Sequence, residues 1–156
     1  TLGLNHQMPI WPLFYPQLLS CLVACSCRAP LLPKDALADA DLVFRGRVLS
    51  IDTISPRGKP DFHPRPGSFI WSLRIAFAPS SFWKGTAVGP VIVTTGNGLA
   101  DCGLSRVQAG QDWLVLAWRD EDSYTTNSCS QSVPFPGAQP FAEALGAPIP
   151  AKPRHD

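Results

Sequence analysis

The chain has 156 residues, with 13 basic and 12 acidic side chains and a formal net charge of +1, which allows one domain and disfavours nucleic-acid binding through a basic surface. Only 16% of the residues are charged, and 17 are prolines. Because a proline inside a helix removes a hydrogen bond and clashes with the preceding turn, this composition disfavours long helices and favours short strands joined by stiff loops.

The amino-terminal segment differs from the rest of the chain. Residues 1–24 contain no Lys, Arg, Asp or Glu, and all the formal charges lie in the residues that follow. The apolar stretch Leu18–Ala24 ends in a small residue before Cys25, which is typical of the core and cleavage point of a secretory signal. We therefore expect a signal peptide over residues 1–24, cleavage after Ala24, and a secreted, periplasmic or extracellular protein. The alternative is an apolar strand or tail that packs on the domain.

Two short segments, Leu18–Cys21 and Leu22–Cys25, resemble the cleavage box of bacterial lipoproteins, in which the cysteine is lipidated and becomes the first residue. Lipidation at Cys21 would make the protein a lipoprotein anchored to a membrane, and without it we expect no membrane association. Three prolines within residues 9–16 argue against a membrane-spanning helix, since such a helix needs about 20 apolar residues.

The chain contains five cysteines, Cys21, Cys25, Cys27, Cys102 and Cys129. An odd number in an exported protein needs an explanation, and loss of Cys21 by cleavage or lipidation leaves four. Lipidation at Cys25 would instead leave three. Four cysteines allow three pairings, of which a Cys25–Cys27 bridge would close a tiny strained ring. Both other schemes tie the Cys-x-Cys pair to two distant sites, and each bridge stabilises the fold by about 3–5 kcal/mol in the chain-entropy model.

A metal site is the competing interpretation of these cysteines. The one-residue gap in Cys25-x-Cys27 is shorter than the gap of about two to four residues that is common between zinc ligands. The three histidines, His6, His63 and His155, are scattered over the leader, a proline-rich segment and the tail. We therefore expect structural disulfides, no metal of the chain's own and no cofactor.

The segment after the leader predicts a short helix that starts near Pro33–Lys34, followed by a half-buried strand at 41–51 with alternating apolar positions. Gly46 inside that strand marks a bend or bulge, which helps a sheet to curl. Residues 52–67 hold four prolines and two glycines and predict a long exposed loop. The clearest period-two pattern follows at 68–78, where a second strand is expected.

Further along the chain, we expect strands at 91–95, 112–118 and 124–129, a helical turn at 141–146 that ends at a glycine, and a frayed tail from residue 148. Five short strands with glycine bends predict a small closed or nearly closed barrel. A small sandwich stays open as an alternative, because periodicity alone does not separate the two architectures.

The order of landmarks along the chain matches a known pattern. The landmarks are Cys25-Ser26-Cys27, Asp35–Val48, Trp83-Lys84-Gly85, Asp101-Cys102-Gly103, Gly110–Val115 and Thr125–Cys129. In this order they resemble the amino-terminal domain of tissue inhibitors of metalloproteinases (TIMPs), and more closely the single-domain, bacterial-type relatives in the netrin-like group. The similarity covers about residues 25–130. It departs from the animal pattern at Leu37-Ala38-Asp39, where the third cysteine of that domain is missing.

The resemblance implies a five-stranded OB-fold barrel with short flanking helices. Together with the strand patterns, we expect an all-β fold with minor α, one domain over residues 25–147 and a flexible tail at 148–156. The resemblance also implies the disulfides Cys25–Cys102 and Cys27–Cys129. In the animal inhibitors, the α-amine and carbonyl oxygen of the first cysteine chelate the zinc of the protease, and the second residue enters its specificity pocket. Cys25 and Ser26 would take these roles, because an amine and a carbonyl can occupy the open zinc position that otherwise holds the attacking water.

Two functions are compatible with this similarity. The first is a secreted TIMP-like domain that inhibits a zinc metalloendopeptidase through Cys25, which requires cleavage immediately before that residue. The alternative is an exported or lipid-anchored OB-fold module that binds another partner without inhibiting a protease. Lipidation at Cys21 would favour the alternative by keeping the Cys25 nitrogen inside the chain. In either case we expect a monomer.

We expect no enzymatic activity and no nucleic-acid partner. The sequence contains no Gly-x-Ser-x-Gly, His-Glu-x-x-His or phosphate-binding loop. Asp120 and Asp122 are interpreted as solvated loop residues rather than catalytic carboxylates. Trp71, Trp113 and Trp118 lie on strand patterns, which favours core packing over stacking on bases.

Overall fold

The computed structural model describes residues 25–54, 72–98 and 102–152, which are mostly β with two short helices and two disulfides. The expectations for the leader, for residues 55–67, for the start of the second strand at 68–71 with Trp71, for Asp101 and for the end of the tail at 153–156 lie outside the described residues. The elements in chain order are α1 (Pro33–Asp39), β1 (Leu42–Ile54), β2 (Ser72–Lys84), β3 (Val91–Gly96), β4 (Asp112–Asp120), β5 (Ser123–Thr125), β6 (Val133–Pro134), α2 (Gln139–Ala144) and β7 (Ile149–Pro150). Neither helix has the length needed to cross a membrane.

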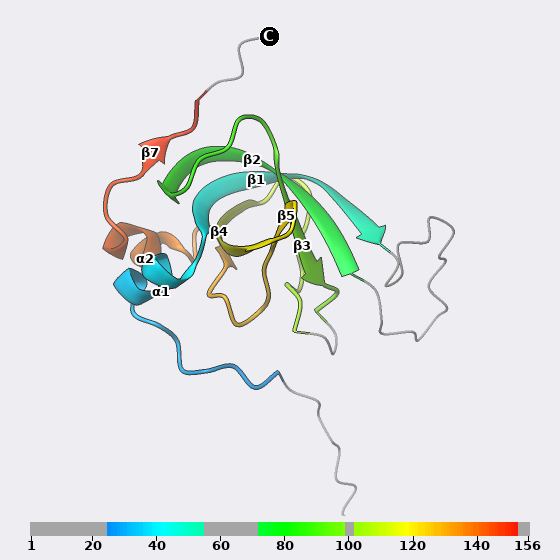
Figure 1. Cartoon of the computed structure of the whole chain (residues 1–156), viewed down its shortest axis with the longest axis horizontal. Coiled ribbons are helices and arrows are strands. Elements are labelled where there is room, and N and C mark those ends of the chain that lie inside the picture. Colours follow the sequence, from blue (N-terminus) through cyan, green and yellow to red (C-terminus); the bar gives the residue numbers. More distant parts are fainter. Residues whose placement is uncertain (1–24, 55–71, 99–101, 153–156) are drawn as a thin grey trace, which may run out of the picture.

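Five of the strands pair in a closed ring. β1 is antiparallel to both β2 and β4, β2 is antiparallel to β3, β3 is parallel to β5, and β5 is antiparallel to β4. Two strands of two residues each lie outside this ring: β6 pairs with β4, and β7 pairs with β2. Within this ring, β1 and β2 are long curved strands that run side by side (Figure 1). The helices α1 and α2 lie side by side next to the ring (Figure 1).

Alternate side chains of β1 and β4 pack into two different hydrophobic clusters. Phe44 and Val115 belong to the cluster between the strands, whereas Val43 and Leu114 belong to the cluster shared with α1 and α2. Burial on both faces explains why Leu42–Phe44 and Trp113–Trp118 are almost uninterrupted apolar runs. The largest fully buried side chains are Phe44, Phe77, Leu42, Ile75, Leu114 and Leu116.

Gly46 lies at a register shift between β1 and β2, as the sequence predicts for a bend in this strand. A Cβ atom at Gly46 would come within 2.9 Å of the Phe44 ring and 3.1 Å of the Ala78 carbonyl oxygen. The lack of a side chain therefore lets the two strands approach where the hairpin bends. Pro79 is the residue opposite Gly46, so β2 tolerates a proline at a point where the ladder is already irregular.

Several predicted boundaries are corrected by the pairing of the strands. β1 continues to Ile54, so residues 52–54 belong to the strand and not to the predicted loop, because they pair with Ser72, Leu73 and Arg74 of β2. β2 ends at Lys84 rather than at residue 78. β5 ends at Thr125 rather than at Cys129, because the chain turns where the Thr126 hydroxyl bonds the Leu116 carbonyl.

The expectation of a flexible tail from residue 148 is wrong for its first residues. Ile149 and Pro150 form β7, which pairs with Phe82 and Ser81, and the Ala151 N–H donates to the Ser80 carbonyl at 3.0 Å. Backbone hydrogen bonds to an exposed strand edge fix this segment although its sequence has no strand signal.

Candidate functional site

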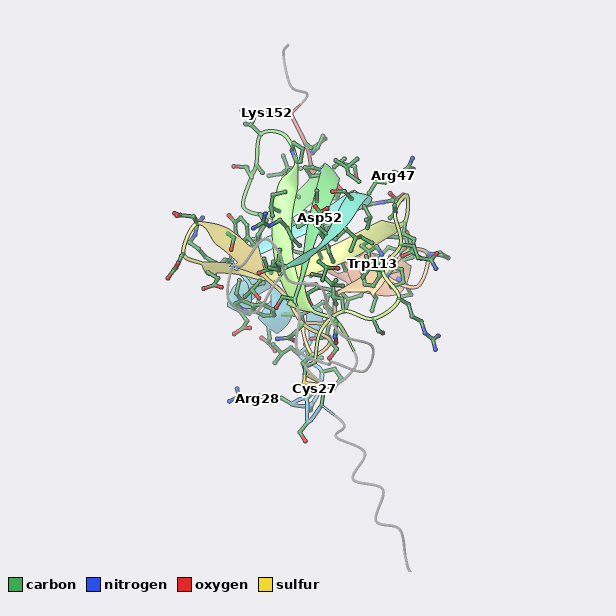
Figure 2. The ribbon with its side chains drawn as sticks, turned by 90° about the vertical axis from the view of Figure 1, so that its right-hand side faces the viewer. Cys27, Arg28, Arg47, Asp52, Trp113 and Lys152 are labelled. Carbon is green, nitrogen blue, oxygen red and sulfur yellow. A yellow bond between two sulfur atoms is a disulfide. The ribbon has the colours of Figure 1, made fainter. Side chains whose placement is uncertain are left out.

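The segment that carries Cys25, Ser26 and Cys27 lies at one end of the molecule. Figure 2 places Cys27 and Arg28 at this end and Lys152 at the opposite end. Cys25 is half-buried, whereas Ser26 and Cys27 are exposed. Residues 25–32 have no helical or strand conformation, so their position depends on side-chain bonds to the rest of the domain.

Two disulfides hold this segment to distant loops. Cys25 is bonded to Cys102 and Cys27 to Cys129, with Cα–Cα distances of 5.4 Å and 5.2 Å. These are the two pairs that the family resemblance implies. They span 77 and 102 residues, so each stabilises the fold by about 4–5 kcal/mol in the chain-entropy model. Ser26 therefore lies between two residues whose positions are fixed covalently.

The loop that receives Cys25 is shaped by a close backbone approach. A Cβ atom at Gly103 would overlap the backbone of Gly96 at the end of β3, so a side chain does not fit there. The Leu104 N–H donates to the Thr95 hydroxyl at 3.0 Å, and the Leu104 side chain is buried in the core. These contacts anchor the residues next to Cys102, which itself has a left-handed backbone with φ of 58°.

The loop that receives Cys27 is held by a buried cluster of hydroxyls. Thr126 Oγ1 lies 2.7 Å from the Leu116 carbonyl oxygen and 2.9 Å from Ser130 Oγ, and the Leu116 N–H donates to Ser132 Oγ at 2.9 Å. The three hydroxyl residues are buried, so their mutual bonds replace water. The Ser128 N–H donates to the Cys102 carbonyl at 2.7 Å, which joins the two cysteine loops directly.

Gln131 is a site residue that the sequence does not identify. Its Oε1 accepts from the Leu31 N–H and its Nε2 donates to the Leu31 carbonyl, each at 3.0 Å. This carboxamide therefore holds Leu31 through both backbone groups, as a neighbouring strand would. A glutamine two residues after a cysteine is not a recognisable motif, and only the folded position of residue 31 gives it this role.

The carbonyl oxygen of Cys25, the second proposed zinc-binding group, accepts from the Cys27 N–H at 3.2 Å. A carbonyl oxygen has two lone pairs, so one can take a hydrogen bond while the other faces a partner. Ser26, which lies between these two residues, is exposed. Residues 25–27, which the two disulfides hold in place, form one edge of the domain. The first two residues of the expected mature chain lie at this edge.

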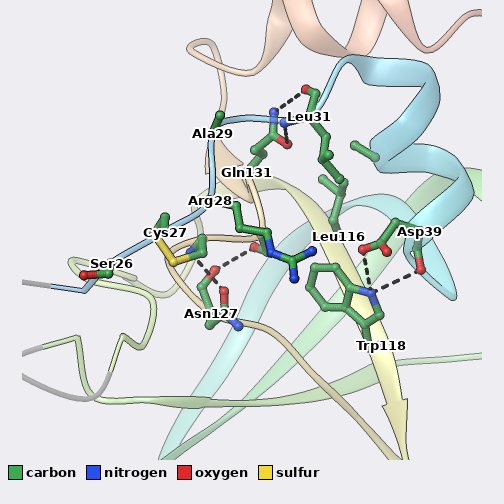
Figure 3. Close-up of a pocket in the computed structure, with 13 residues that line it drawn as sticks. Ser26, Cys27, Arg28, Ala29, Leu31, Asp39, Leu116, Trp118, Asn127 and Gln131 are labelled. Carbon is green, nitrogen blue, oxygen red and sulfur yellow. Dashed lines mark hydrogen bonds between the residues drawn. A yellow bond between two sulfur atoms is a disulfide. The ribbon is translucent and has the colours of Figure 1, made fainter.

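A pocket of about 370 Å³ lies behind this edge (Figure 3). One wall is the segment from Ser26 to Leu31, the floor includes Leu116, and the opposite wall carries Asp39 and Trp118. Trp118 Nε1 donates to both the backbone oxygen and Oδ2 of Asp39, at 3.1 and 3.2 Å. Trp118 is half-buried, so the prediction that it packs in the core is correct only in part, whereas Trp113 is buried at 4% exposure.

The landmark residues Trp83 and Lys84 are not part of residues 25–27 and instead bond β2 to the ends of the two helices. Lys84 Nζ donates to the Ala38 carbonyl near the end of α1 at 2.8 Å, and Trp83 Nε1 donates to the Gly146 carbonyl at 2.8 Å. Asp120 is exposed at the end of β4, and Asp122 is exposed in the turn after it. Within residues 25–54, 72–98 and 102–152, no group of three or more His, Cys, Asp or Glu side chains could hold a metal ion.

The two disulfides are typical of an oxidising environment, such as the periplasm or the extracellular space. Comparison of the chain with protein-family models and with curated proteins finds no match.

Proposed function

We propose that this chain is an exported inhibitor of zinc metalloendopeptidases, similar to the TIMP amino-terminal domain. In this proposal, the ring of five strands is an OB-fold barrel that presents Cys25 and Ser26 to the protease. The observation that carries the proposal is the attachment of Cys25 and Cys27 to two loops through two disulfides, with Ser26 exposed between them.

The proposed chemistry depends on a free amine at Cys25. While Ala24 is attached, this nitrogen belongs to a peptide bond and its lone pair is delocalised, so it is a poor metal ligand. Cleavage after Ala24 converts it to an amine beside the Cys25 carbonyl. Amine and carbonyl together can then occupy the zinc position at which a metalloprotease activates water.

Rigidity of the edge supports tight binding. Ordering a loop and its side chains on association costs free energy, and a segment that is already fixed avoids most of that cost. Here the two disulfides, the contact between the Cys25 carbonyl and the Cys27 N–H, and the Gln131 contacts to Leu31 fix the segment before any partner binds. Ser26 is then the side chain with access to a pocket beside the zinc.

The first test is amino-terminal sequencing and intact mass of the protein exported by its host. The proposal expects a chain that begins at Cys25, has a free amine, and is four hydrogens lighter than its reduced form because of the two disulfides. A lipidated Cys21 or a retained leader would exclude zinc chelation and favour the anchored binding module.

A second test uses Ser26. Ser26 is replaced by Leu or by Gly in a chain that begins at Cys25. Each replacement should change the order in which zinc endopeptidases rank by inhibition constant, because the side chain at this position fills or empties the specificity pocket of the protease. Thr86→Leu is the matched control, since Thr86 is exposed between β2 and β3 and does not line the pocket beside the edge. An unchanged ranking for both Ser26 variants would contradict the role of Ser26.

A further inference from the structure

The pocket behind the disulfide-held edge has the size and composition of a small-ligand site. Its volume of about 370 Å³ is within the range of about 300–1,000 Å³ for such sites. Its floor is apolar, with Leu116 and Ala36 both buried. Leu31 and the ring of Trp118 extend the apolar surface up the walls (Figure 3).

Two opposite charges lie on facing walls of this pocket. The guanidinium of Arg28 is directed toward Trp118 and Asp39 (Figure 3). In the part of the chain that the structure describes, Arg28 has no ion pair or hydrogen bond. Asp39 accepts from Trp118 Nε1 through Oδ2, and its other carboxylate oxygen has acceptor capacity left. Arg28 and Asp39 are both exposed, so the pocket offers a donor for an anion and an acceptor for a cation that a ligand can reach from solvent.

The wall that carries Arg28 is fixed without any ligand. The Cys27–Cys129 disulfide holds it on one side of Arg28, and the two hydrogen bonds between Gln131 and Leu31 hold it on the other. A pocket whose walls are fixed in advance loses little ordering entropy when it is filled.

We propose that this pocket binds a small zwitterion with an apolar side chain, either a free amino acid or a dipeptide. The ligand carboxylate pairs with the Arg28 guanidinium, which is suited to a two-pronged contact with a carboxylate. The ligand ammonium group pairs with the Asp39 carboxylate. Its apolar side chain packs on Leu116 and the Trp118 ring. The pocket shares Ser26 and Cys27 with the proposed zinc-binding edge, but the ligand contacts are assigned to other lining residues. The proposal therefore does not depend on protease inhibition.

The test is isothermal titration calorimetry of the full chain with its disulfides intact, using L-phenylalanine and L-leucyl-L-phenylalanine as probes. We expect saturable binding of at least one probe, and the two arms distinguish an amino-acid site from a dipeptide site. Acetylation of the amine or amidation of the carboxylate should each weaken binding by about two- to fivefold, because each removes one ion pair with an exposed side chain.

Protein variants locate the site. Arg28→Gln and Asp39→Asn should each weaken binding of the unmodified probe by about two- to fivefold, because both side chains are exposed and solvent screens their ion pairs. Arg74→Gln is the matched control, because Arg74 is an exposed cation on β2 and does not line the pocket. A thermal melt of each variant should match the parent chain, which separates loss of binding from loss of folding.

Three results would overturn the proposal. They are no binding of either probe at millimolar concentration, equal binding of the acetylated and free probes, and equal binding by the parent chain and the Arg28→Gln and Asp39→Asn variants. Amide chemical-shift changes at residues 28–31, 39 and 118 on addition of the probe would support the assigned position. Changes only outside these residues would be a fourth result that overturns the proposal.

Discussion

Gln131 and Leu31 are joined by two hydrogen bonds of 3.0 Å through a single carboxamide, although 100 residues separate them in the chain. Gln131 also has a left-handed backbone, with φ of 64°. The side chain thus reaches Leu31 from a backbone conformation that is costly for most residues. We conclude that this pair helps to fix the segment that follows the Cys-x-Cys motif.

Gln131→Asn should release Leu31 without disturbing the turn, because asparagine tolerates a left-handed backbone but its side chain is one methylene shorter. We expect a loss of about 1–2 kcal/mol in the free energy of unfolding, as for two partly exposed hydrogen bonds. Hydrogen exchange of the Leu31 amide should become faster, and its protection in the variant should be compared with that of the Ala36 amide in α1. Unchanged exchange at Leu31 would show that the carboxamide does not hold this residue.

Paired serine substitutions should reveal the contribution of each disulfide. Cys27→Ser with Cys129→Ser opens a bridge that spans 102 residues, so the unfolding free energy should fall by about 2–5 kcal/mol. The Cys25→Ser, Cys102→Ser pair should cost a similar amount, because its span of 77 residues enters only through a logarithm. In a chain that keeps residues 1–24, Cys21→Ser is the control and should leave the denaturant midpoint unchanged, since the four other cysteines are bonded to one another.

Gly103→Ala should be strongly destabilising, because the added methyl group would overlap the backbone of Gly96. We expect a loss of more than about 2 kcal/mol, as for other cases of backbone overlap or overpacking. Gly110→Ala is the comparison, since its Cβ atom would meet nothing within 4 Å and its positive φ of 84° alone should cost about 1–2 kcal/mol. Urea denaturation of both variants measures the difference, and equal losses would contradict the close approach at Gly103.

Thr126→Val keeps the shape of the side chain and removes its hydroxyl. Thr126 is 2% exposed, so the Leu116 carbonyl and the Ser130 hydroxyl would lose a partner that water does not replace. We expect a loss of about 1–3 kcal/mol in the unfolding free energy. Thr86→Val, at an exposed position between β2 and β3, should change it by less than about 0.5 kcal/mol. Similar effects of the two substitutions would mean that the buried hydroxyl cluster does not stabilise the loop.

The periodicity of the sequence predicted which side chains of β1 face the core and where this strand bends. The alternation in β1 places Phe44 and Val48 in the core and leaves Arg47 exposed, and the bend at Gly46 follows from the absence of a side chain. The end of β2 and the short strand β7 were not predictable in this way. Pro79 suggests a strand end unless its partner Gly46 is known, and Ile149 pairs only because an edge of β2 is available.

The candidate site was also predictable only in part from the sequence. Cysteine spacing pointed to Cys25 and Cys27 as residues tied to two distant loops, because the alternative ring between them is strained. The hydrogen bonds of Asp39 and Gln131 and the position of Arg28 at the pocket could not be predicted from the sequence. Each depends on a neighbour that only the folded chain brings close, such as Trp118 for Asp39 and Leu31 for Gln131.

The most direct test of the proposed inhibitor compares two chains that differ by one residue. The first begins at Cys25 with a free amine, and the second carries one additional alanine before Cys25, which places the cysteine nitrogen in a peptide bond. Both are assayed for their inhibition constants against the same panel of zinc endopeptidases. The account predicts that the first chain inhibits at least one enzyme and that the added alanine weakens inhibition by about a hundredfold or more. Equal inhibition by both chains, or none by the first against any enzyme of the panel, would contradict it.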